Sequence, residues 1–137
     1  MSSMRRSIRI RMEGGTVAHV SICSVDGRPV QTRAAKVFVN YLSADSIEFM
    51  TYLKLQADKR LELHFDLQFN EWHFSLIGEL ELHQWKRDGN QYVYQCALQP
   101  DPHIRGAIIR ALEQMLQRMN PSATFVHAIY RRHESGR

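Results

Sequence analysis

The middle of the chain alternates between apolar and polar residues with a period of two. From position 61 to position 69, leucine or phenylalanine fills every odd position and a polar residue fills every even one. Successive side chains of a β-strand point to opposite faces, so this pattern predicts a strand with one buried face and one wet face. Asn70 and Glu71 then form a tight turn into a second alternating segment, residues 72–82.

The same pattern recurs in short segments along most of the chain. We predict six strands, at residues 16–25, 34–41, 47–51, 61–69, 72–82 and 92–98. Residues 26–29 and 87–90 contain the Asp-Gly pairs that favour turns between strands, and Gly78 is expected to mark a bulge or a bend. Short antiparallel strands with close turns favour a closed or nearly closed barrel, because closure removes exposed sheet edges.

After residue 100 the period changes to that of a helix. Asp101 is a suitable N-cap and Pro102 suits the first helical position. One apolar stripe at helical spacing follows, made of Ile104, Ile108, Leu112, Met115, Leu116 and Met119. We therefore predict a mainly β fold, a small six-stranded antiparallel β-barrel with a C-terminal α-helix packed on it. Residues 120–137 form a tail, either a further short element or a docking segment.

Length and composition limit the class of protein. A chain of 137 residues favours one domain, and 44% hydrophobic with 23% charged residues is typical of a folded one. No apolar run reaches the ~18–20 residues that a membrane span needs, so we expect no membrane insertion. The N-terminus carries charge where a signal peptide would be apolar, which predicts a cytoplasmic protein.

Positive charge is concentrated at the N-terminus. Residues 1–12 hold four arginines and no acidic residue, which leaves 14 basic and 14 acidic groups in the rest of the chain. Arginine suits phosphate and the guanine edge, although a solvated basic leader is an equal alternative. The neutral body disfavours specific binding to long nucleic acid. We expect a flexible arm at 1–15, the barrel and helix at 16–119, and the tail at 120–137.

Signals for catalysis are weak. The seven histidines are scattered without metal-ligand spacing, and no GxSxG, P-loop or GxGxxG motif is present. Cys23 and Cys96 lie inside predicted strands, where buried thiols are the usual outcome. We therefore predict no catalytic residue, no metal site, no cofactor and no enzymatic activity.

Two short segments carry a resemblance to a known family. Arg5 and Arg9 form an RxxxR spacing before the first strand, and the segment 41–49 forms a polar turn around Ser43. In this order the chain resembles the PilZ domain family, small bacterial barrels that bind cyclic di-GMP through RxxxR and a later [D/N]xSxxG. The likeness covers roughly residues 5–119 and includes Gly78 and the final helix.

The resemblance implies which residues contact the nucleotide: Arg5, Arg6, Arg9, Tyr41, Ser43 and Ser46. Two positions depart from the family pattern. Tyr41 replaces the acidic or amide residue, so a phenol stands where a guanine acceptor is expected, and Ser46 replaces the glycine that permits a positive φ. Asn40 and Asp45 lie nearby and would substitute only if the turn is rebuilt.

As the resemblance implies, the chain is expected to be a signalling receptor or adaptor. The arginine arm would wrap around cyclic di-GMP, the turn at Ser43 would form the opposing wall, and ordering of the arm would alter the surface shown to an unidentified protein partner. The alternative is a degenerate domain that has lost the nucleotide and acts as a protein–protein adaptor in motility, pilus or envelope regulation. A monomer or weak homodimer is expected in either case.

Overall fold

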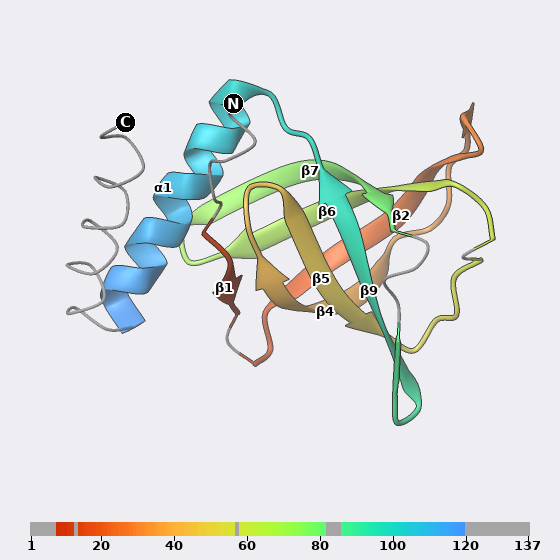
Figure 1. Ribbon diagram of the computed structural model, residues 1–137, viewed down its shortest axis with the longest axis horizontal. Helices are drawn as coiled ribbons and strands as arrows, with labels where there is room; N and C mark the ends of the chain where they lie inside the picture. Colours follow the sequence, from red (N-terminus) through yellow and green to blue (C-terminus); the bar gives the residue numbers. More distant parts are fainter. Residues whose placement is uncertain (1–7, 13, 57, 82–85, 120–137) are drawn as a thin grey trace.

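The computed structural model describes residues 8–12, 14–56, 58–81 and 86–119 of the chain. Figure 1 shows a twisted antiparallel sheet with one helix across its end. In chain order the elements are β1 (Ile10–Arg11), β2 (Val17–Val25), β3 (Arg28–Pro29), β4 (Ala35–Leu42), β5 (Ser46–Thr51), β6 (Leu61–Phe69), β7 (Trp72–Leu80), β8 (Lys86–Asp88), β9 (Gln91–Leu98) and α1 (Pro102–Met119).

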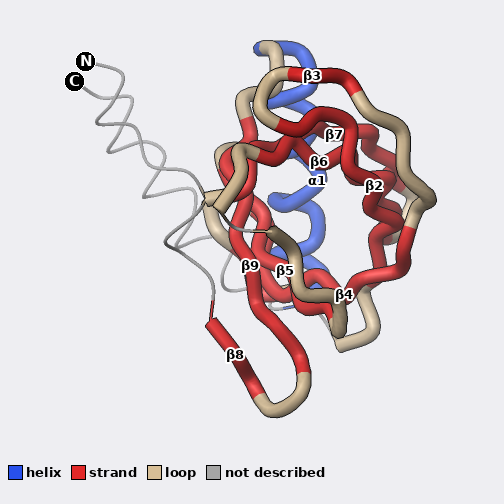
Figure 2. The backbone as a smooth tube through the Cα atoms, turned by 90° about the vertical axis from the view of Figure 1, so that its right-hand side faces the viewer, coloured by secondary structure: helices blue, strands red, loops and turns tan. Residues whose placement is uncertain are grey.

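Among the described residues, six strands close into a barrel. The antiparallel pairings run in the order β4, β5, β9, β7, β6 and β2, and β2 pairs back to β4 from Val17–Phe38 to Val20–Ala35. Figure 2 shows this ring of strands with α1 behind it. The predicted six-stranded antiparallel barrel with a C-terminal helix is confirmed.

The alternating apolar positions fill the inside of this ring. On β6, every odd-numbered side chain is buried, and Leu63, Phe65 and Leu67 are completely so. Phe49 of β5 packs edge-on against Phe65, with ring centroids 5.4 Å apart. The period of two therefore separates one apolar core from an outer wall of polar side chains.

Helix α1 closes one end of the barrel, which we call the helix end (Figure 1). The side-chain carboxylate of Asp101 accepts a hydrogen bond from the N–H of Ile104 at 3.0 Å and so caps the helix. Ile108 and Leu112 are fully buried, as the apolar stripe predicted. In the described part of the chain, no helix is both long and apolar enough to cross a membrane.

Strand β1 lies within the segment that we predicted as a flexible arm. Ile10 pairs with Leu42 and Arg11 pairs with Tyr41, and Ile10 and Met12 are buried. The barrel thus includes residues before position 16, because these two apolar side chains belong to its core. Arg5, Arg6 and the tail 120–137 lie outside the described residues.

Gly78 marks a close approach between strands and no bulge. The pairing of β7 with β6 continues through Gly78 without a register shift, and the pairing of β7 with β9 begins at Gly78. A Cβ atom at this position would lie 2.9 Å from the Cβ of Cys96 and 3.0 Å from Leu98 Cδ2. Of the two predicted alternatives, a bulge or a bend, the bulge was wrong, since the glycine serves the contact between β7 and β9.

Candidate functional site

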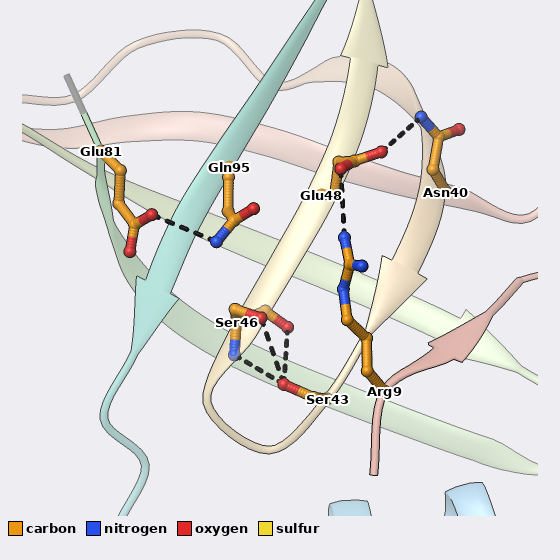
Figure 3. Close-up of polar contacts among 7 residues, drawn as sticks. All are labelled: Arg9, Asn40, Ser43, Ser46, Glu48, Glu81 and Gln95. Carbon is orange, nitrogen blue, oxygen red and sulfur yellow. Dashed lines mark hydrogen bonds and ion pairs between the residues drawn. The ribbon is translucent and has the colours of Figure 1, made fainter. Parts of the chain in front are cut away.

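The turn between β4 and β5 is organised by Ser43. Its N–H donates to the carbonyl of Ser46 at 2.9 Å, and its hydroxyl oxygen accepts from the N–H groups of Asp45 at 3.1 Å and Ser46 at 3.0 Å. The two serine hydroxyls lie 3.2 Å apart (Figure 3). Ser43 is buried, with only 3% of its surface exposed. Its hydroxyl therefore stabilises its own turn.

Ser46 fits this turn without backbone strain. Among the described residues other than glycine, a positive φ occurs at Asp26 and Asn70, and Ser46 has the ordinary conformation of the first residue of β5. The departure from glycine at this position therefore carries no conformational cost here.

Asp45 faces the helix. Its carboxylate forms an ion pair with Arg105 of α1, and its carbonyl accepts a hydrogen bond from the N–H of Leu98 at 2.8 Å. Asp45 therefore fastens the turn to the helix end and does not replace the acidic residue that is missing at position 41.

The outer wall above this turn carries a cluster of four side chains, which we call the Arg9 cluster: Arg9, Asn40, Tyr41 and Glu48. The guanidinium carbon of Arg9 lies 4.0 Å from the centroid of the Tyr41 ring. The same guanidinium donates to one oxygen of Glu48 at 3.2 Å, and the amide of Asn40 donates to the other at 3.2 Å. Figure 3 shows Arg9 reaching across the wall to Glu48.

Local strand pairing explains how the Arg9 cluster forms. The β1–β4 pairing places the chain at Arg9 beside the end of β4, and Tyr41 lies directly opposite Glu48 in the β4–β5 register. The register shifts between Val39 and Tyr41, which leaves Asn40 as the extra residue of β4. Sequence reasoning missed Glu48, although it lies on the polar face of the predicted strand 47–51.

Arg9 is held only weakly in this position. The Arg9 side chain is 48% exposed and that of Glu48 is 18% exposed. An ion pair this close to solvent contributes about 0–1 kcal/mol, and an exposed cation–π contact about 0.5–1 kcal/mol. An anion can therefore draw Arg9 away from Glu48 at small cost.

A cleft of about 520 Å³ adjoins the Arg9 cluster. It lies between the end of β1, the outer wall of β4 and β5, and the β8–β9 hairpin that projects from the barrel in Figure 2. Its lining combines two cations, Arg11 and Lys86, and two carboxylates, Glu48 and Asp88, with apolar and aromatic surface. The apolar and aromatic part consists of Phe38, Tyr41, Met50 and Val93. The volume falls in the range of about 300–1,000 Å³ that small-molecule sites occupy. The formal charges of the lining residues therefore cancel, and Arg9 beside the cleft adds one positive charge.

The structure brings some of the predicted site residues together. Arg9 stacks on Tyr41, and Ser43 bonds to Ser46 at the end of the same two strands. The cation Lys86 was not predicted, because its place beside the cleft follows from the β8–β9 pairing alone.

Outside this wall, two of the described histidines pair with single polar neighbours. His64 Nε2 lies 2.6 Å from the Ser75 hydroxyl, and His73 pairs with Asp66. The hydrogen bond from His73 lowers the pKa of Asp66. Across the residues that the structure describes, no group of three or more histidine, cysteine or acidic side chains is arranged to hold a metal ion.

Likeness to known proteins is found among solved structures. No family model matches the chain, and no curated protein matches it. Among solved structures, the chain is similar to the Borreliella burgdorferi PlzA protein, crystallised in complex with c-di-GMP, with a TM-score of 0.47 and 14% sequence identity. The match covers 85% of this chain and 55% of that one, so this chain spans about half the length of PlzA in that structure.

Proposed function

We propose that this chain is a PilZ-like receptor that binds cyclic di-GMP on the outer wall beside β1, β4 and β5. The observation that carries the proposal is the contact between Arg9 and Tyr41, 4.0 Å from guanidinium carbon to ring centroid. Arg9 is the second arginine of the RxxxR spacing, and Tyr41 is the first position of the second motif. The β1–β4 pairing joins these two distant segments at one edge of the cleft.

The chemistry of the wall suits a dianion with flat bases. Arg9 and Arg11 provide guanidinium groups that form bidentate hydrogen bonds with phosphate, and Lys86 adds a third positive charge. Glu48 and Asp88 also line the cleft, so these five side chains together carry a net charge of +1. The ring of Tyr41 and the apolar floor offer stacking surface to a guanine. On binding, Arg9 exchanges the carboxylate of Glu48 for a phosphate oxygen. Arg5 and Arg6 are expected to close over the ligand from the arm.

A protein-contact adaptor is the second candidate, and one observation favours it. The polar groups of the site already have partners without a ligand. Arg9 forms an ion pair with Glu48, and the hydroxyl of Ser43 accepts hydrogen bonds from the backbone of its own turn. A domain whose polar groups are already paired among themselves presents a fixed wall to a partner protein. The titration below separates the two functions.

The test is calorimetric titration with cyclic di-GMP, and with cyclic di-AMP and GTP for comparison. Arg9→Ala removes one charge-assisted contact, so we expect an affinity loss of about ten- to a hundred-fold. Arg60→Ala is the matched control, because Arg60 also forms an exposed 3.2 Å ion pair, with Glu79, and does not line the cleft. Absence of binding by the wild type would favour the adaptor, and equal loss in both variants would place the ligand elsewhere.

The variant Glu48→Gln tests the exchange itself. With the competing charge removed and the hydrogen-bond geometry kept, Arg9 is released to the phosphate, and we expect tighter binding of the dinucleotide. The matched control is Glu81→Gln, because Glu81 accepts a hydrogen bond from Gln95 at 3.1 Å on the same wall, whereas the ion-pair partner of Arg9 is Glu48. Weaker binding by Glu48→Gln would show that the carboxylate contacts the ligand directly.

A further inference from the structure

The barrel end opposite α1 holds a second hollow, which the proposed nucleotide site does not use. We call this the open end. The hollow measures about 260 Å³ and lies among the last residues of β5, the first residues of β4 and β6, and the middle of β2. Two connecting segments, residues 30–34 and 52–55, form its mouth. Figure 2 looks into the ring of strands from this end, with α1 behind the ring.

The lining of the hollow is almost wholly apolar. Its floor consists of core side chains, with Val37, Phe49 and Leu63 at 2%, 1% and 0% exposure. Leu53 stands at the mouth with 52% of its surface exposed, and its neighbour Tyr52 is 65% exposed. Water gains few hydrogen bonds in a space of this kind, so an apolar group enters it favourably. The volume lies below that of most drug-sized ligand sites and suits one short chain.

Hydrogen bonds hold both sides of the mouth in place. The Thr32 hydroxyl oxygen accepts from the N–H of Ile22 at 2.9 Å and fixes the first connecting segment to β2. The Tyr94 hydroxyl accepts from the N–H of Leu55 at 2.8 Å and donates to the carbonyl of Leu53 at 3.5 Å, which fixes the second. The hollow is therefore formed before any ligand arrives.

A single cation stands among the lining residues. Arg33 follows Thr32 directly and lines the hollow, whereas none of the lining residues is acidic. Within the described part of the chain, the guanidinium of Arg33 forms no ion pair. An anionic head group placed at the mouth thus meets one positive charge and no repelling carboxylate of the lining.

We propose that the open end binds a small anionic amphiphile, a straight alkyl chain of medium length that ends in a carboxylate. The chain enters the hollow between Phe49 and Leu63, and the carboxylate stays at the mouth beside Arg33. The charge of Arg33 and the apolar floor together select this occupant over a neutral alcohol or a short polar acid. The inference does not depend on nucleotide binding, which uses a different face of the barrel.

The test is calorimetric titration of the full chain with straight-chain carboxylates from hexanoate to dodecanoate, below their micelle concentrations. Each added methylene should raise the affinity about fourfold until the hollow is full, after which the affinity levels off. The alcohol of equal length should bind more weakly. Absence of binding, a stoichiometry above one, or an affinity that is independent of chain length would overturn the proposal.

Two variants locate the ligand. Arg33→Gln should remove the preference for the carboxylate over the alcohol and leave the chain-length dependence intact. Its matched control, Arg28→Gln, changes an exposed arginine of β3 that does not line the hollow and should keep the preference. Ala35→Phe places a ring in the hollow and should lower the affinity for every chain at least tenfold. If Arg33→Gln keeps the preference, or a folded Ala35→Phe binds normally, the site lies elsewhere.

Discussion

The two ends of the barrel finish the same core in different ways. At the helix end, α1 packs its buried face on the core, and Asp45 and Glu71 in the two neighbouring turns pair with Arg105 and Arg118 of the helix. At the open end, no helix covers the core within the described residues, and Leu53 stands 52% exposed over a hollow of about 260 Å³. Burial at one end supplies stability, whereas the other end keeps apolar surface free for binding.

The largest expected effect compares one leucine from each end. Leu112→Ala removes a fully buried side chain beneath α1 and should lower the free energy of unfolding by about 2–5 kcal/mol. Leu53→Ala removes the same atoms from a half-exposed position and should change it by about 0.5 kcal/mol or less. Urea unfolding of both variants measures the difference. Similar losses would mean that the open end is packed as tightly as the helix end.

The second effect appears at alkaline pH. Burial raises the pKa of the Cys96 thiol above its ordinary value of 9.0, so the folded protein keeps this thiol neutral while the unfolded chain ionises. The stability that this difference provides is fully present below pH 9 and falls as the pH rises further. The slope from one such group reaches about 1.4 kcal/mol per pH unit.

Two cysteine variants test which thiol causes this pH dependence of the unfolding free energy. Cys96→Ala should flatten the pH dependence of the unfolding free energy between pH 9 and 10.5. Cys23→Ser should retain most of it, because Cys23 lies on β2 near the open end and is only partly buried. If Cys23→Ser removed the larger part of this pH dependence, the loss of stability at alkaline pH would arise from the thiol near the open end.

The smallest expected effect concerns the ion pairs of the helix end. Asp45→Asn removes the pair with Arg105, in which the two side chains are 51% and 26% exposed. Pairs of this kind contribute about 0–1 kcal/mol, so we expect a small drop in melting temperature that vanishes in high salt. A loss above about 2 kcal/mol would show that charge, more than apolar packing, holds α1 in place.

The barrel strands and the helix could be predicted because each buries one face. Its apolar residues therefore recur at a regular spacing in the sequence. Strands β3 and β8 leave no such period, since all their side chains are exposed. Strand β1 did leave a signal: Ile8, Ile10 and Met12 alternate with two arginines. These five residues, two of them arginines, were too few to distinguish a strand from an arm.

The candidate site was less predictable because it depends on strand register. The contact between Arg9 and Glu48 requires both the β1–β4 pairing and the shift after Val39, and neither is written in the spacing of a motif. The role of Ser43 was within reach of sequence reasoning. A serine at the start of a tight turn commonly bonds the backbone N–H groups that follow it, as it does here.

The two residues of β1 also bear on how the protein behaves at high concentration. Two strands pair with the same edge of β4. Strand β2 pairs with it as far as Phe38, and β1 pairs with it at Tyr41 and Leu42. A bare strand edge is a template for pairing with a second chain. A chain that began after Met12 would expose these unpaired backbone groups beside an uncovered patch of core. By pairing with this edge, strand β1 therefore opposes edge-to-edge aggregation of the barrel. The colloidal stability of the protein depends on the same short segment that positions Arg9 beside Glu48.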